Sequence, residues 1–184
     1  MEINQHLLIP ARQLSSPNVS ARPEGEEISL LVIHNISLPP GEYGGAYIDE
    51  LFCNQLDCSV HPFFDSIKEL RVSSHLLITR EGELTQYVPF NIKAHHAGES
   101  CFDGRDQCND FSIGIELEGT DDEAFTAEQY RVLGEVTRVI MENYPAITPE
   151  RITGHSDIAP GRKTDPGPCF DWTLFRSLIN AGND

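Results

Sequence analysis

The chain has 184 residues, of which 39% are hydrophobic, and this length can bury one core, so we expect a single domain. It carries 13 Lys and Arg residues against 29 Asp and Glu residues, a formal net charge of -16. This charge argues against nucleic acid and membrane surfaces as partners, because both are anionic and would repel the chain. No apolar run in the sequence is long enough to cross a membrane.

The N-terminal sequence MEINQHLLIPARQL lacks the basic segment, the long apolar stretch and the cleavage site of a secretory signal, so we expect a cytoplasmic protein. The five cysteines agree with this expectation, because their number is odd and none forms a CxxC pair. Cys101 and Cys108 flank one polar loop and could pair, but free thiols in a reducing compartment fit the pattern better.

The first predicted element of the domain is a buried strand. Residues 1–27 are polar and contain three prolines, and we interpret them as a lead-in packed on a domain of residues 28–184. The almost fully apolar run at residues 29–33 predicts a strand buried on both faces. This strand delivers His34 and Asn35 at its C-terminal end, which is where open α/β sheets bind ligands.

Two short helices and a hairpin are expected next. Residues 37–45 are rich in Pro and Gly and predict a loop, and apolar residues at helical spacing in residues 46–56 predict a helix. A second helix begins near Pro62. Residues 74–79 and 83–88 flank an Arg-Glu-Gly turn, which predicts a β-hairpin and adds an antiparallel pair to the sheet.

Residues 111–118 alternate between apolar and polar side chains, which predicts a strand with one apolar face. Glu116 and Glu118 share its other face. A carboxylate in the middle of an apolar strand is costly to bury unless it is paired, binds metal or faces a cleft, so we expect a cleft beside Glu116. Glu118 lies nearer the strand end and is expected to be solvated.

The clearest predicted helix begins with a capping box at Thr126 and ends at Tyr144, before a proline. A last helix is expected to start with Asp171 as its N-cap. A hairpin combined with buried strands and amphipathic helices predicts an α/β fold, a single domain with a central mixed β-sheet flanked by helices.

The segment from Gly154 to Pro168 combines His155 and Asp165 with a backbone constrained by three prolines. A catalytic zinc site takes three protein ligands and leaves one position open. His34 and His155 each end a short apolar segment, so adjacent strands could bring them to one ion, although a lone buried histidine is more often structural.

From the residues alone, the carboxylate ligand stays open between Asp157 and Asp165. Asp157 could instead brace a turn, and Asp165 precedes a rigid Pro-Gly-Pro run. Glu116 could act as a general base. Lys163 could stabilise a developing oxyanion, although a surface ammonium explains it equally well.

Five segments carry a family resemblance: HNIS (34–37), AHHAG (94–98), NDFSIGIE (109–116), GH (154–155) and RKTDPGP (162–168). They occur in order over residues 10–180 and resemble the zinc-dependent N-acetylmuramoyl-L-alanine amidases. The resemblance is strongest to the cytosolic enzymes that recycle 1,6-anhydromuramyl peptides. It implies an amidase or peptidoglycan-recognition-like fold.

The resemblance also implies roles for individual residues. It implies zinc ligands at His34, His155 and Asp165, which favours Asp165 over Asp157, with Glu116 as the base and Lys163 as a stabiliser of the transition state. It places Asn35, Arg71 and His96 among the substrate-binding residues. The sequence departs from the family pattern at two positions, with His95 in place of a tryptophan and Gln107 in place of an arginine.

The activity implied is hydrolysis of the amide bond between the lactyl group of (1,6-anhydro-)N-acetylmuramic acid and L-alanine of the stem peptide, with Zn²⁺ as cofactor. The expected partner is a small muropeptide, bound by a monomer. Two alternatives stay open at this point: a muropeptide-binding module without activity, and a zinc peptidase that cuts within the stem peptide.

Overall fold

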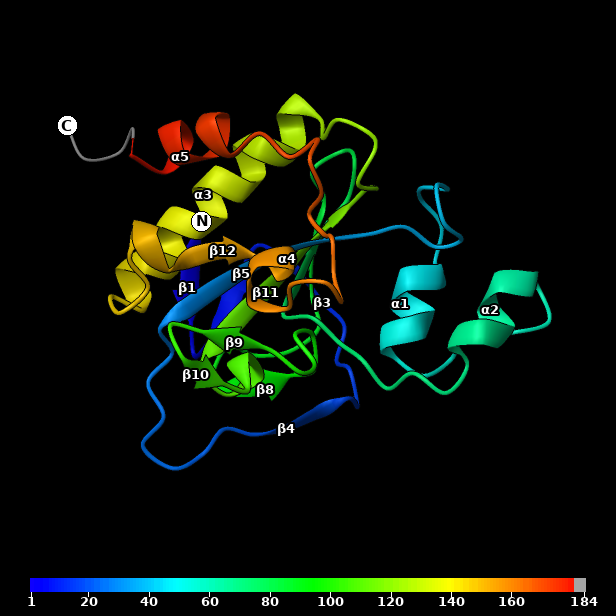
Figure 1. The fold of residues 1–184 in the computed structure, drawn as a ribbon, viewed down its shortest axis with the longest axis horizontal. Helices are drawn as coiled ribbons and strands as arrows, with labels where there is room; N and C mark the ends of the chain where they lie inside the picture. The colour runs from blue at the N-terminus through cyan, green and yellow to red at the C-terminus, as the bar shows by residue number, and fades with distance from the viewer. Residues whose placement is uncertain (181–184) are drawn as a thin grey trace.

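The computed structural model describes residues 1–180, so residues 181–184 at the end of the predicted domain lie outside the described part of the chain. A sheet that includes β5, β11 and β12 forms the centre of the molecule (Figure 1). It has six strands in the order β12-β5-β11-β6-β7-β3. These strands are β3 (Arg12–Gln13), β5 (Leu30–Ile36), β6 (Leu76–Ile78), β7 (Leu84–Gln86), β11 (Ser112–Glu118) and β12 (Ile152–Gly154).

The sheet is mixed, as predicted. Strands β12, β5, β11 and β6 run parallel, whereas β7 pairs antiparallel with β6 and forms the predicted hairpin. Strand β5 continues to Ile36, past its predicted end at Ile33, because its pairing with β11 extends to Glu118. His34 therefore lies inside a strand, where it is the register partner of Glu116 on β11.

The helices are α1 (Tyr47–Phe52), α2 (Pro62–Ile67), α3 (Ala127–Asn143), α4 (His155–Ile158) and α5 (Trp172–Asn180). Helix α3 begins with the predicted capping box. Thr126 Oγ1 accepts a hydrogen bond from Gln129 N–H at 3.1 Å, and Thr126 N–H donates to Gln129 Oε1 at 3.0 Å. At the start of α5, Asp171 Oδ1 accepts from Leu174 N–H at 2.9 Å, which confirms the predicted N-cap.

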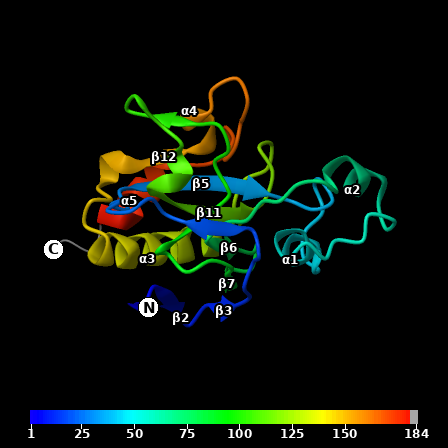
Figure 2. The same cartoon turned by 90° about the horizontal axis from the view of Figure 1, so that it is seen from below.

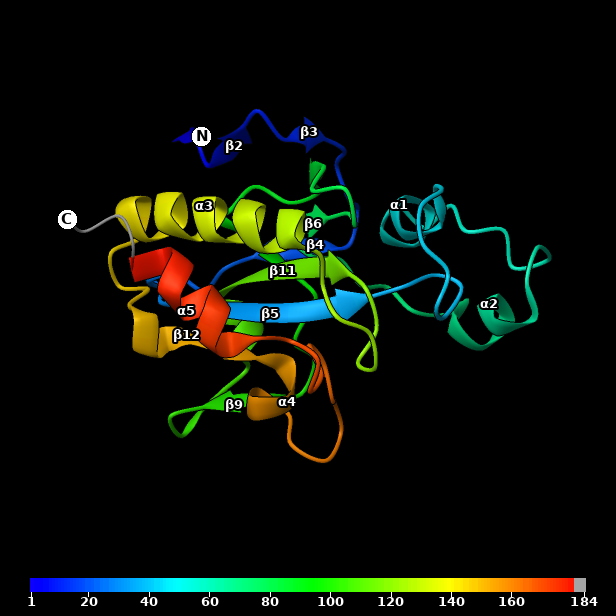
Figure 3. The same cartoon turned by 90° about the horizontal axis from the view of Figure 1, so that it is seen from above.

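Different parts of the chain pack on the two faces of the six-stranded sheet. Odd-numbered residues of β5 and β11, such as Ile33 and Ile115, pack against α3 and α5 in the main core (Figure 2). Even-numbered residues, such as Val32, face the opposite side, where α4 and residues 94–111 cover the sheet (Figure 3). Because His34 and Glu116 are also even-numbered, they belong to this second face.

Helices α1 and α2 lie beyond the C-terminal ends of β5 and β11 (Figures 2 and 3). They pack in a separate apolar cluster that includes Phe52, Phe64 and Leu77. Helix α1 is shorter than predicted, because Asn54 adopts a φ of 57° and this left-handed conformation interrupts the helix. The two helices form a wall next to the strand ends.

The remaining strands are short and form three two-stranded sheets separate from the six-stranded sheet. They are β1 (Glu2–Asn4), β2 (Leu7–Ile9), β4 (Val19–Ala21), β8 (Ile92–Ala94), β9 (Cys101–Phe102) and β10 (Arg105–Asp106), with single 3-10 turns at Cys108–Asp110 and Pro149–Arg151. All five cysteines are free thiols. None of the helices within residues 1–180 has the length and apolarity needed to span a membrane.

Candidate metal centre

Backbone pairing across three parallel strands brings the candidate residues into one row. Glu116 of β11 is the register partner of His34 of β5, and Gly154 of β12 is the partner of Ile33. His155 follows Gly154 directly and therefore stands beside His34. This row lies near the C-terminal ends of the parallel strands, the edge at which open α/β sheets bind ligands.

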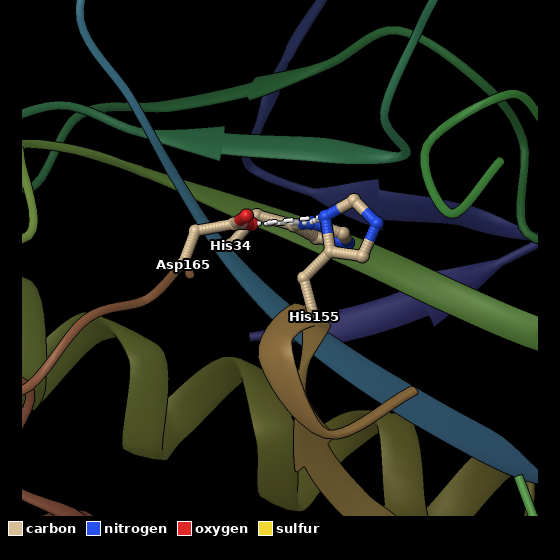
Figure 4. A group of neighbouring side chains, drawn as sticks. All are labelled: His34, His155 and Asp165. Atoms are coloured by element: carbon tan, nitrogen blue, oxygen red, sulfur yellow. Dashed lines mark hydrogen bonds and ion pairs between the residues drawn. The ribbon is translucent and has the colours of Figure 1, made fainter. Parts of the chain in front are cut away.

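His34, His155 and Asp165 converge from a strand, the first turn of α4 and a loop (Figure 4). The Nδ1 atoms of the two histidines are 3.0 Å apart, and Asp165 Oδ2 lies 3.0 Å from each of them. Ser156 N–H donates to the backbone oxygen of Asp165 at 2.9 Å and holds the loop in place. These side chains form a group that can hold a metal ion.

The chemistry of the three ligand atoms fits a cation. His155 Nε2 lies 3.0 Å from the carbonyl oxygen of Ala97, which can only accept, so Nε2 carries a proton and Nδ1 is the nitrogen that can offer a lone pair to a metal. Burial lowers the pKa of His34 to about 4, so this ring is neutral at pH 7. Two lone pairs and a carboxylate facing one another repel unless a cation lies between them.

The spacing of the ligand atoms also suits zinc. Two imidazoles and one carboxylate make a three-ligand set of the kind that catalytic zinc uses, and ligand atoms bonded at about 2.0–2.2 Å to a tetrahedral ion lie roughly 3.3–3.6 Å apart. The observed separations of 3.0 Å are close to this range.

Asp157 has a different role from Asp165. Its Oδ2 accepts hydrogen bonds from Thr153 Oγ1 at 2.9 Å and from Gly154 N–H at 3.0 Å, so it caps the first turn of α4. This carboxylate is therefore engaged in bracing the turn that carries His155.

Glu116 is buried beside this group, with a side chain whose Oε2 has no hydrogen-bond partner among the described residues. Burial, followed by the negative charge of Asp165, raises the pKa of Glu116 well above its usual range, against the opposing charge of Lys163. A buried carboxyl without a hydrogen-bond partner at Oε2 and with a raised pKa is suited to general acid–base chemistry.

These residues share a cavity of about 280 Å³, which is lined on one side by His34, His155, Asp165, Glu116 and Lys163. Its other side is apolar and comes from α1, α2 and the chain around them. The Lys163 side chain is exposed and forms no ion pair within residues 1–180, so its ammonium is available to a bound molecule.

The sequence of this chain is similar to those of known proteins. A sequence model described as N-acetylmuramoyl-L-alanine amidase matches residues 24–168. The chain is 58% identical over 172 residues to the 1,6-anhydro-N-acetylmuramyl-L-alanine amidase AmpD of Salmonella typhimurium (strain SL1344), covering 94% of this chain and 91% of that relative. The chain belongs to the N-acetylmuramoyl-L-alanine amidase family. The family resemblance inferred from the five sequence segments is thereby confirmed.

Solved amidase structures have the same fold. A crystal structure of a selenomethionine AmpD derivative matches this amidase with a TM-score of 0.95 and 55% identity, covering 97% of this chain and 99% of that chain. A complex of the amidase AmiD from E. coli with the substrate anhydro-N-acetylmuramic acid-L-Ala-D-γ-Glu-L-Lys matches with a TM-score of 0.61 and 29% identity, covering 85% of this chain and 60% of that chain.

The three residues predicted to bind substrate lie in different environments. Asn35 lines the cavity, and its amide donates to Asp121 Oδ1 at 2.7 Å. Arg71 does not line it; its guanidinium donates to the carbonyls of Lys68 and Leu70 at 2.9 and 2.8 Å. His96 reaches the cavity but is buried against His34. Substrate binding by these residues remains a prediction for this amidase.

The predicted exposure of Glu118 is wrong. This carboxylate is 2% exposed and accepts hydrogen bonds from Gly44 N–H at 2.5 Å and from Arg80 N–H at 3.1 Å. The loop between β5 and α1 folds back over the end of β11 and covers it. Because such a contact joins residues 74 positions apart, periodicity within the strand could not reveal it.

Asn109 and Ser112 form hydrogen bonds with residues 96 and 97 beside the candidate metal centre, and they were not identified from the sequence. One signal was present, because Gly114 interrupts an otherwise well-formed strand pattern and a glycine inside a strand often marks a close approach. A Cβ atom at Gly114 would lie 2.5 Å from the ring of His96. The glycine therefore makes room for an imidazole packed on the sheet.

Proposed function

We propose that this amidase is a zinc-dependent enzyme that hydrolyses the amide bond between the lactyl group of (1,6-anhydro-)N-acetylmuramic acid and L-alanine of the stem peptide, in recycling of the cell wall. Its family membership and its 58% identity to a 1,6-anhydro-N-acetylmuramyl-L-alanine amidase support this activity. The observation that carries the proposal is the group of His34, His155 and Asp165 beside the buried, unpaired Glu116.

In this proposal, His34 Nδ1, His155 Nδ1 and Asp165 hold one zinc ion. Zinc in such a site supplies Lewis acidity, which polarises a carbonyl group and makes water nucleophilic near neutral pH. The two imidazoles bind as neutral rings, which fits the depressed pKa of His34. The carboxylate adds one negative charge to the ligand set.

Glu116 acts as the general base and then as the general acid. It takes a proton from the attacking water and returns it to the leaving L-alanine nitrogen, a role that its raised pKa supports. The Lys163 ammonium stabilises the negative charge that develops on the lactyl oxygen during attack. Its exposed position on the rim of the same cavity supports this role.

The proposed substrate is a small muropeptide. The support is indirect, since the similar E. coli AmiD was solved with anhydro-N-acetylmuramic acid-L-Ala-D-γ-Glu-L-Lys. Asn35 is a proposed substrate contact at the rim of the cavity. Arg71 is a second one, but its guanidinium would first have to leave the carbonyls of Lys68 and Leu70.

We also propose that the enzyme works in the cytoplasm as a monomer. Free thiols at all five cysteines suit a reducing compartment. The metal-binding group and Glu116 come from one chain, so a single copy can supply the site. The proposed catalytic unit spans residues 28–184, with residues 1–27 as a lead-in packed on it.

Product analysis by mass spectrometry tests the proposed reaction. A purified anhydromuramyl tripeptide is incubated with the enzyme loaded with zinc, and in parallel with enzyme treated with a chelator. We expect free intact tripeptide and free anhydro sugar, and no products after chelation. Peptide fragments would indicate a zinc peptidase, and an unchanged substrate that still binds would indicate a binding module.

A further inference from the structure

One short backbone segment contacts both histidines of the metal centre. His34 Nε2 lies 2.9 Å from His96 Nδ1, and His155 Nε2 lies 3.0 Å from the carbonyl oxygen of Ala97. Residues 96 and 97 therefore supply an acceptor to the outer nitrogen of each imidazole whose Nδ1 faces Asp165. Two ligands from distant parts of the chain are held by neighbouring residues.

We propose that His96 is a positioning residue of the metal centre, which fixes the orientation and tautomer of His34, and that the backbone of Ala97 does the same for His155. The proposal rests on the zinc site put forward above. It gives His96 a different role from the substrate contact that the family resemblance implies.

The hydrogen-bond chain has one consistent direction. A neutral His34 that offers its Nδ1 lone pair to a metal carries its proton on Nε2 and donates it to His96 Nδ1. His96 then carries its own proton on Nε2 and donates to Ser112 Oγ at 3.1 Å. Each ring thus fixes the tautomer of the next, and both nitrogens of His96 are used within the protein.

The burial of His96 favours a positioning role over direct contact with substrate. His96 is only 9% exposed, although it reaches the wall of the cavity. With Nδ1 occupied by His34 and Nε2 by Ser112, the ring has no free polar atom for a substrate. The imidazole also lies directly over Gly114, where a Cβ atom would come within 2.5 Å of it, so it cannot turn toward the cavity without leaving its packing.

The side chain of Asn109 holds the backbone of residues 96 and 97 in place. Its Oδ1 accepts hydrogen bonds from His96 N–H at 3.1 Å and from Ala97 N–H at 2.8 Å. Arg162 adds a further hydrogen bond to the carbonyl oxygen of Ala97 at 2.6 Å. Asn109 Oδ1 therefore helps to position the two residues whose atoms accept from the imidazoles, namely His96 with its Nδ1 and Ala97 with its carbonyl oxygen.

Outer-shell partners of metal-bound histidines fix ring orientation and raise ligand basicity, and their loss typically costs about 10–100-fold in metal affinity or activity. We expect zinc affinity to fall by this factor when His34 loses its acceptor. Zinc affinity is measured without substrate, so it is independent of the proposed reaction.

The test compares His96→Leu with His96→Asn by competition for zinc with a chromophoric chelator. The side chains of Leu and Asn have the same number of heavy atoms and the same branched shape, but only Asn offers an Oδ1 near the position of the imidazole Nδ1. We expect the dissociation constant of His96→Leu to rise about 10–100-fold, and that of His96→Asn to rise much less. A packing role alone predicts the opposite order, since Leu suits a buried position better than Asn.

Asn109 supplies a second pair that leaves every histidine in place. Asn109→Asp keeps the accepting oxygen, whereas Asn109→Ala removes it, so only the alanine variant should weaken zinc binding. Thermal unfolding of the metal-free proteins checks that each variant is folded. If His96→Leu does not fold, the two Asn109 variants still test whether this segment positions the histidines.

The possible outcomes are distinct. Loss of affinity in His96→Leu with recovery in His96→Asn, or loss in Asn109→Ala but not in Asn109→Asp, supports the inference. Wild-type zinc affinity in both His96→Leu and Asn109→Ala overturns it, as does a weaker affinity in His96→Asn than in His96→Leu. If the wild-type chain takes up no zinc, the proposed metal site fails and the inference fails with it.

Discussion

Glu116 and His34 lie directly opposite each other on the adjacent parallel strands β11 and β5. Partners in a parallel pair point to the same face, so the carboxyl group and the imidazole face the same cavity. Their relative position is set by the backbone ladder in the middle of the sheet and not by a mobile loop. Such preorganisation suits the proposed roles of Glu116 as a general base and of His34 as a metal ligand.

Replacing Glu116 with Gln should leave zinc bound but lower turnover by at least about 10²-fold, because the amide cannot accept the proton from water. The matched control is Glu118→Gln, on the same face of the same strand but hydrogen-bonded to Gly44 and Arg80. We expect the control to keep most of its activity. Steady-state kinetics and metal analysis of both variants check this, and normal turnover in Glu116→Gln would exclude it as the base.

Asp165→Ala should lose zinc and activity together, because it removes one of the three proposed metal ligands. Asp157→Ala should keep one zinc per chain and lose about 1 kcal/mol of stability, since Asp157 caps the first turn of α4. Elemental analysis and denaturant unfolding distinguish the two effects. Full zinc content in Asp165→Ala, or metal loss in Asp157→Ala, would reverse the assignment of the carboxylate ligand.

Lys163→Met should reduce kcat by about 10²–10³-fold, the usual cost of removing one donor to an oxyanion, without changing zinc content. The control is Lys68→Met, because Lys68 pairs with Asp65 on the surface near α2 and does not line the cavity. The measurement is the turnover of an anhydromuramyl peptide by both variants. Equal turnover in the two variants would rule out a catalytic role for Lys163.

Stability should fall in acid partly through His75, which is fully buried beside Arg22. Its Nδ1 accepts from Gly114 N–H at 3.0 Å, and its Nε2 lies 3.0 Å from the oxygen of Ile92, so the ring is neutral. Burial, and secondly the charge of Arg22, lowers the pKa of His75 to about 3. The unfolded chain, with a histidine pKa of about 6.5, therefore binds one more proton between these values.

The stability that neutral His75 contributes is complete above about pH 6.5 and is lost as the pH falls toward about 3. We expect the free energy of unfolding to fall more steeply in the wild type than in His75→Asn, by at most about 1.4 kcal/mol per pH unit. Urea unfolding with a chelator present, from pH 7 to pH 4, measures this difference. Identical slopes would show that His75 does not titrate as described.

Much of the local structure follows from short-range patterns. The apolar run before His34, the alternation that ends at Glu118 and the capping box at Thr126 each involve residues close in sequence. Strand and helix formation depend on such neighbours, so β5, β11 and α3 could be predicted. Their ends were less certain, as the extension of β5 to Ile36 and the early end of α1 show, because pairing with distant strands and a left-handed Asn54 decide them.

The candidate site was only partly predictable. Two histidines at the ends of apolar segments indicated a shared ion, but the choice between Asp157 and Asp165 was open until the resemblance to a family was considered. In the structure, the Asp157 carboxylate accepts a hydrogen bond from Gly154 N–H in its own turn, whereas the Asp165 carboxylate lies next to the two imidazoles. That difference depends on which carboxylate a folded loop turns toward the sheet.

The order of residues was enough to identify the side chains available for chemistry, the strands that carry them and the family to which the chain belongs. Long-range packing was needed to show that Glu116 faces His34, that Glu118 is covered by a returning loop, and that His96 is hydrogen-bonded to His34. The physical reason is that these contacts join residues 62 to 82 positions apart in sequence, and strand register and packing bring such residues together.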